Sequence, residues 1–182
     1  MRKIISSTMM TLNGVMENPQ LWSFDYWNDE ISQYAYDQLF ASDTLIMGRL
    51  TYEGFAEAWS SRAGADAFAD RMNDLPKYVA SRTLADPLEW KANLIEGEAA
   101  AALASLKQQP GQDILQYGCG ELTYTLIQAG LVDELRLLVY PVVVNEGRRL
   151  LDELDKLGLK LLTTQTFNSG VIALHYQPIQ AQ

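Results

Sequence analysis

The stretch that decides the fold is YGCGELTYTLIQAGLVDELRLLVYP, residues 117–141. It predicts the end of a buried strand, a turn flanked by glycines, one helix ended by Gly130, and then another strand. Gly118 and Gly120 bracket Cys119 where the strand becomes a helix. The first amides of a helix lack intrahelical partners and the helix dipole is positive there, so this turn is a candidate phosphate site. An ordinary tight turn is the alternative interpretation of this stretch alone.

A second strand–turn–helix unit lies upstream, in TLIMGRLTYEGF, residues 44–55. Its first four residues are apolar, as is typical of a short strand covered on both faces. A glycine, an arginine and a hydroxyl then follow in the turn, before a helical pattern that runs to Trp59. The residues of this turn are Gly48, Arg49, Leu50 and Thr51.

A third candidate turn, Ser81-Arg82-Thr83, follows the predicted strand 78–80. The three turns together offer free amides, hydroxyl groups and two arginines. In open α/β sheets, ligands bind at the carboxyl ends of the strands. A phosphorylated nucleotide fits this set of groups best, although a surface arginine is more commonly just solvated.

With these turns, the chain resembles the dihydrofolate reductase fold, and within it the C-terminal reductase domain of the bifunctional riboflavin-biosynthesis deaminase/reductase. The resemblance runs in the family's order from residue 2 to about residue 176. It implies a three-layer α/β/α fold with a mostly parallel mixed sheet. The motifs that carry it are Asn13-Gly14, Gly48-Arg49-Leu50-Thr51-Tyr52-Glu53, Ser81-Arg82-Thr83, Gly118-Cys119-Gly120-Glu121-Leu122, Gly130-Leu131-Val132-Asp133-Glu134-Leu135 and Pro141-Val142-Val143-Val144-Asn145-Glu146-Gly147.

The pattern of the remaining segments predicts the same α/β class. Strands separated by helices, followed by a terminal hairpin, indicate a mostly parallel sheet with an antiparallel edge. Asn28 is a candidate helix cap, and Pro141 marks a strand end. The predicted strands are 2–10, 44–47, 78–80, 114–117, 135–140, 159–167 and 171–176. The predicted helices begin at 29, 52, 63 and 98, with one more after the turn 118–120.

Bulk properties fit one globular domain over residues 1–182, with 48% hydrophobic and 20% charged residues. The formal charge of −9 disfavours nucleic acid or an anionic membrane as a main partner. The N-terminal segment predicts a first strand rather than a signal peptide. A single cysteine, Cys119, fits a reducing compartment. We therefore expect a cytoplasmic protein.

The resemblance implies NADPH as the cofactor and hydride transfer to a C=N or C=O bond. Arg49, Arg82 and Ser81 would hold the adenosine 2′-phosphate, because an arginine fork suits that dianion. The pyrophosphate would lie between two sets of residues: Gly48, Leu50 and Thr51 on one side, and Gly118, Cys119, Gly120, Glu121 and Leu122 on the other. Two departures from the family pattern matter: Cys119 stands where a second glycine is usual, and Asn13 where aspartate is usual.

The substrate end is less well defined by the sequence. A folate reductase carries a carboxylate early in the helix that faces the pterin, and Asp29 and Glu30 fall near that place as candidate catalytic residues. Helix-dipole stabilisation alone would also favour carboxylates there. Trp22, in the position of a mobile loop, and Phe55 are candidate substrate contacts, with plain core packing as the alternative for both.

Other chemistries find little support. The chain has no P-loop motif, and its Gly118-Cys119-Gly120 turn lacks the third small residue of a Rossmann fingerprint. With one histidine and one cysteine, a His/Cys metal site or a Cys–His nucleophile pair is not expected. His175 alternates with Val171 and Ala173 on a strand, which favours a structural role.

Three functions remain open from the sequence. The first is an NADPH-dependent reductase of a small pterin- or pyrimidine-like substrate. The second is the riboflavin-pathway reductase of 5-amino-6-(5-phosphoribosylamino)uracil, which needs a further basic cluster for the substrate phosphate. The third is an NADPH-binding protein without catalysis. We expect the apolar strand 135–144 to end at a sheet edge. Together with the resemblance, this leads us to expect a homodimer.

Overall fold

The computed structural model describes residues 1–154 and 156–179 and shows an α/β fold built on one eight-stranded sheet. The strand order is β4-β3-β2-β5-β1-β6-β8-β7. The strands are β1 (Ile4–Thr11), β2 (Ser42–Gly48), β3 (Lys77–Ala80), β4 (Ala92–Leu94), β5 (Asp113–Tyr117), β6 (Glu134–Tyr140), β7 (Gly158–Thr166) and β8 (Ile172–Ile179). The α-helices are α1 (Asp29–Phe40), α2 (Arg49–Trp59), α3 (Ala67–Asp74), α4 (Ala99–Gln108) and α5 (Glu121–Gln128).

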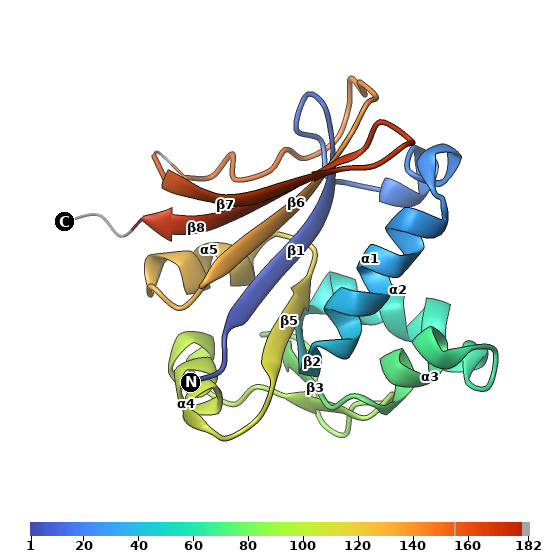
Figure 1. The fold of residues 1–182 in the computed structure, drawn as a ribbon. Helices are drawn as coiled ribbons and strands as arrows, with labels where there is room; N and C mark the ends of the chain where they lie inside the picture. Colours follow the sequence, from blue (N-terminus) through green and yellow to red (C-terminus); the bar gives the residue numbers. More distant parts are fainter. Residues whose placement is uncertain (155, 180–182) are drawn as a thin grey trace.

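Helices cover both faces of the sheet, which gives the predicted three layers. Helices α1, α2 and α3 lie on one face and α4 and α5 on the other (Figure 1). Successive side chains of a strand point to opposite faces, so Ile4 packs with α4 and α5 while Ile5 packs with α1, α2 and α3. The central strands are therefore apolar on both sides, as their sequences predicted.

The sheet is parallel from β4 to β6 and antiparallel at β8 and β7, in agreement with the prediction. After β2 the chain passes through α2 and α3 to β3, toward one end of the sheet. After β5 it passes through α5 to β6, toward the other end. The neighbouring strands β2 and β5 thus form the topological switch point, where open α/β sheets bind ligands.

The structure differs most from the sequence prediction at three elements. Helix α2 begins at Arg49, inside the predicted turn, and not at residue 52. The helix predicted from residue 63 begins only at Ala67, because the Asp66 side chain accepts the Ala69 amide at 2.7 Å and caps it there. Gly64, at φ +83°, keeps the preceding segment out of the helix. The short strand β4 was not predicted, because a three-residue strand has no readable periodicity.

The expectation that residues 135–144 end at a sheet edge is wrong. The strand β6 lies between β1 and β8, and both of its sides are paired. The edge strands are β4 and β7. Along the edge strand β7, Leu161 and Leu162 are 50% and 46% exposed, so this edge presents apolar side chains to solvent.

Across the described ranges, every helix is too short or too polar to cross a membrane.

Candidate functional site

Two helices begin side by side at the switch point, each directly after a glycine. Gly48 precedes α2 and Gly120 precedes α5, and within the described part of the chain neither helix has a side-chain cap. The strands before them are paired, with Ile46 opposite Gln116. A Cβ added at Gly118, which has φ +79°, would lie 3.3 Å from the Thr51 hydroxyl. The turns predicted from two distant segments therefore lie against each other, and their first-turn amides point from the same edge of the sheet.

Cys119 does not obstruct this edge. Its side chain is buried, 7% exposed, and packs with Met16 and Tyr124 beneath the start of α5. Burial raises the pKa of the Cys119 thiol to about 11. The departure from a glycine pair thus places a neutral thiol in the core and leaves the backbone of the turn accessible.

The third predicted turn joins the same site through an ion pair. Arg82, after β3, pairs with Glu121, the first residue of α5. The Ser81 hydroxyl accepts the amides of Thr83 and Leu84 at 3.1 and 3.0 Å, which fixes the turn in a compact form. The three predicted nucleotide turns therefore come together at one edge of the sheet.

Arg49 stands at the first position of α2, and its guanidinium pairs with Glu53 one turn later, with 2.9 Å between Nη1 and Oε2. Leu50 is 67% exposed beside it. Both predicted arginines thus lie at the site, and each is held by a glutamate in the free protein.

Sequence reasoning missed a third arginine near these turns. A Cβ added at Gly120 would lie 3.5 Å from Nη2 of Arg148. The loop that carries Arg148 is tied to the N-terminal segment, since its amide donates to Glu17 Oε2 at 3.2 Å and its carbonyl accepts the Met16 amide at 3.0 Å. The dipeptide Arg148-Arg149, directly after the resembling block 141–147, was the signal that could have revealed it.

The two candidate catalytic carboxylates lie elsewhere. Asp29 and Glu30 are exposed at the start of α1 and line a hollow of about 490 Å³ together with Gln165 of β7. Glu30 accepts hydrogen bonds from the amide and the side chain of Asn168, at 2.8 and 3.0 Å. The structure thus brings both carboxylates to the β7–β8 hairpin, four strands away from β2, and not to the nucleotide turns.

Trp22 and Phe55 belong to different apolar clusters. Trp22 is 7% exposed and packs edge to face on Tyr140, with 5.4 Å between ring centroids. Phe55, on α2, packs on Tyr117, with 5.6 Å between centroids. Phe55 and Tyr117 therefore stand beside the glycine turns, whereas Trp22 is part of the core under α1.

A buried polar network, also missed from the sequence, fills the space between α1 and the sheet. A carboxylate only accepts hydrogen bonds, so His175 Nδ1 donates to Glu134 at 3.0 Å and leaves Nε2 to accept the Tyr34 hydroxyl at 2.8 Å. Arg136 Nε donates to the same carboxylate at 2.8 Å. These hydrogen bonds, that of His175 first, lower the pKa of Glu134 to about 2. The network ties β6, β8 and α1 together.

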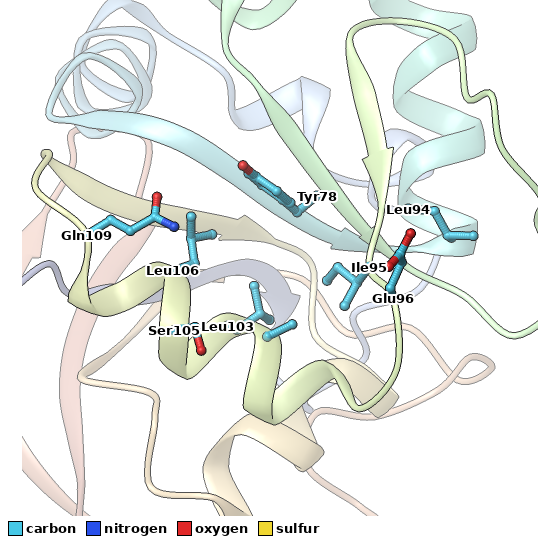
Figure 2. A pocket seen from close by; sticks show the side chains of 9 residues that line it. Tyr78, Leu94, Ile95, Glu96, Leu103, Ser105, Leu106 and Gln109 are labelled. Carbon is cyan, nitrogen blue, oxygen red and sulfur yellow. The ribbon is translucent and has the colours of Figure 1, made fainter.

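A second hollow, of about 230 Å³, lies between α4 and the strands β3 and β4 (Figure 2). Tyr78, Ile95, Leu103 and Leu106 give it a mainly apolar lining, with Glu96 and Gln109 at its ends. None of the predicted site residues lines it.

Comparison with known proteins identifies the family of the chain. The family described as the RibD C-terminal domain matches residues 2–173. The chain belongs to this family. One relative is "Uncharacterized protein YyaP" of Bacillus subtilis, which is 32% identical over 179 residues that cover 96% of this chain and 94% of the relative.

Solved structures show the same fold. A pyrimidine reductase-like protein of Corynebacterium diphtheriae is similar with a TM-score of 0.66 and 14% identity, over 99% of this chain and 93% of that one. RibD of Acinetobacter baumannii is similar with a TM-score of 0.69 and 18% identity, over 99% of this chain and 59% of that one. The predicted fold and the RibD reductase-domain resemblance are thereby confirmed.

Proposed function

We propose that this protein is an NADPH-dependent reductase that transfers hydride to a C=N or C=O bond of a small pterin- or pyrimidine-like substrate. One observation carries the proposal: the uncapped starts of α2 and α5 lie together at the switch point, with Arg49, Arg82 and Arg148 around them. Membership of the RibD C-terminal domain family, which commonly uses NADPH, supports it.

The groups at this edge fit a nucleotide phosphate. Helix-start amides and guanidinium groups are both donors that recognise phosphate oxygens. The positive end of the helix dipole at each helix start also favours an anion. An added Cβ at Gly48 would meet no atom within 4 Å, so the backbone there is open to a ligand. In a chain of net charge −9, this concentration of arginines also supports an anion at this edge.

In the proposed complex, Arg49, Arg82 and Ser81 hold the 2′-phosphate, and the turns at Gly48 and Gly118 hold the pyrophosphate. Bound NADPH supplies the hydride. The chain's own contribution is to orient the cofactor and to shield it from water. Phe55 and Tyr117, packed against each other beside the turns, are the apolar side chains that we assign to that shielding.

A second candidate, an NADPH-binding protein without catalysis, is favoured by the position of Asp29 and Glu30. Both carboxylates face β7, and Glu30 is already bound to Asn168. A third, the riboflavin-pathway reductase, needs a cationic group for the substrate phosphate. Arg148, beside Gly120, is the group that supports this candidate.

Titration with NADPH followed by steady-state oxidation assays against a panel of pterins and pyrimidines tests the proposal. We expect NADPH to bind and at least one compound to be reduced. Binding without turnover of any compound would favour the non-catalytic protein, and reduction restricted to the phosphoribosylamino-pyrimidine would favour the riboflavin pathway. A protein that binds no NADPH would contradict all three.

We also propose a homodimer, on the basis of the family resemblance and the exposed edge strand β7. Light scattering coupled to gel filtration would then give about twice the chain mass of 20.4 kDa. Replacing Leu161 with lysine at the edge is expected to restore the monomer mass.

A further inference from the structure

The two arginines assigned to the 2′-phosphate are held in different ways. The Arg49–Glu53 pair is local, since both residues lie on α2 four positions apart. The Arg82–Glu121 pair joins the turn after β3 to the first residue of α5, 39 positions further along the chain. Only the second pair crosses the place where the nucleotide turns meet.

The Arg82–Glu121 pair is also highly exposed, with side chains 87% and 74% accessible. Exposed ion pairs contribute little to stability because water and salt screen them. This pair can therefore open at small cost. Glu121 nevertheless sits where the α5 dipole favours an anion, so its carboxylate occupies the electrostatic position of a phosphate.

We infer that Glu121 is a specificity-determining residue that competes with the 2′-phosphate for Arg82. The inference rests on the proposed function and deepens it. In the free protein the carboxylate neutralises Arg82, and the incoming phosphate must displace it. Since the carboxylate repels a phosphate dianion but not a ribose hydroxyl, Glu121 weakens the preference for the phosphorylated cofactor.

The two arginines assigned to the 2′-phosphate each face one carboxylate. Glu53 pairs with Arg49 and Glu121 pairs with Arg82. Removing the carboxylate of Glu121 takes one negative charge from the place where the turns meet. Removing it also releases Arg82 from its ion pair. Both effects strengthen the binding of the 2′-phosphate.

The test compares E121Q with the unmodified chain in calorimetric titrations with 2′,5′-ADP and 5′-AMP, which differ by the 2′-phosphate. We expect E121Q to bind 2′,5′-ADP about three- to fivefold more tightly, the scale of an exposed ion pair, with 5′-AMP changed less. E98Q is the matched control, because Glu98 is an exposed glutamate at the start of α4 that forms no ion pair with the described residues. It should change neither affinity.

The melting temperature of E121Q should fall slightly, because a negative charge is lost at a helix start. Tighter binding would then not reflect a general stabilisation. In the R82Q background, E121Q should lose most of its gain, since Arg82 transmits the effect. A gain retained in that background would overturn the inference.

Equal tightening of both nucleotides, no change, or weaker binding of 2′,5′-ADP by E121Q would likewise contradict the role of Glu121 while leaving the proposed function in place. If neither the unmodified chain nor E121Q binds 2′,5′-ADP or NADPH, the proposed function fails and the inference with it.

Discussion

Helices α1 and α3 begin with a capping side chain, whereas α2 and α5 begin with a glycine. Asn28 and Asp66 accept first-turn amides of α1 and α3 at 3.0 and 2.7 Å. Gly48 and Gly120 offer no side chain. The Thr123 hydroxyl accepts the Gly120 amide at 3.2 Å, but among the described residues no side chain accepts the first-turn amides of α2 or α5. In the first pair the amides are used within the fold, and in the second pair they remain available.

The difference follows the position of the helices in the sheet. Both α2 and α5 start at the carboxyl ends of neighbouring parallel strands, β2 and β5, whereas the segment before α1 is a loop that leaves the sheet. The starts of α2 and α5 thus lie where a ligand can approach, whereas α4, which also lacks a side-chain cap, follows the edge strand β4. The residue before each of these four helices therefore marks the difference. A capping side chain uses the amides within the fold, and a glycine leaves them free to bind a ligand.

The largest effect is expected far from the glycine turns, in the internally satisfied network. Glu134→Gln leaves Arg136 without its carboxylate in a buried setting, so the free energy of unfolding should fall by roughly 3 kcal/mol. NADPH affinity should not change. Urea denaturation measures the free energy of unfolding, and titration measures the NADPH affinity. A loss of NADPH binding with unchanged stability would contradict the separation of the network from the glycine turns.

The same network predicts a pH dependence of stability. The folded pKa of Glu134, about 2, lies below its ordinary value of 4.5, so the unfolded chain binds the proton more readily. The stabilisation is complete above pH 4.5 and declines as the pH falls from 4.5 toward 2. Urea midpoints measured at pH 3, 4 and 6 should show this decline, and Glu134→Gln should show less of it.

At the uncapped helices, Arg49→Ala should lower NADPH affinity about 10- to 100-fold, because charge-assisted hydrogen bonds to the 2′-phosphate are lost. NADH affinity should change far less. Arg62→Ala is the control, since Arg62 lies over Trp59 and away from the turns. An equal loss for both cofactors would remove Arg49 from the 2′-phosphate.

Converting one kind of helix start into the other is the sharpest test of the comparison. Gly48 has an extended conformation, φ −78°, with open space around an added Cβ, so Gly48→Asp can cap α2. We expect a stability gain of a few tenths of a kcal/mol and about a tenfold loss of NADPH affinity, because a carboxylate replaces the phosphate. Gly54→Ala, inside the same helix, should stabilise the chain by about 0.5–1 kcal/mol without that loss. Unaltered cofactor affinity in Gly48→Asp would show that the α2 start is not used.

The smallest effect is expected for the reverse change. Asn28→Ala removes the α1 cap and should lower the free energy of unfolding by about 1 kcal/mol. Thermal denaturation measures this loss, and NADPH titration should give the same affinity as the unmodified chain.

Local signals predicted much of the fold. The apolar runs gave the central strands, the Asn28 cap gave the start of α1, and Pro141 gave the end of β6. These features depend on neighbouring residues only. The predicted start of α3 was too early, because the sequence alone did not single out Asp66 as the capping residue of this helix.

The site was predictable only where chain direction determines it. The glycine turns follow strands and therefore lie at one edge. The close approach of Gly118 to Thr51 depends on β2 and β5 being neighbours, which no spacing in the sequence reveals. The direction of Asp29 and Glu30 depends on the rotation of α1 against the β7–β8 hairpin. The Arg82–Glu121 pair and the approach of Arg148 likewise depend on tertiary structure alone.

The buried position of Cys119 turns the only sulfhydryl of the chain into a natural reporter. With its pKa near 11, it resists alkylation at neutral pH unless the start of α5 opens. The rate at which an alkylating reagent labels the protein therefore measures how often the start of α5 opens. A nucleotide seated across the segment would slow the labelling, which offers a way to detect ligands without any turnover assay.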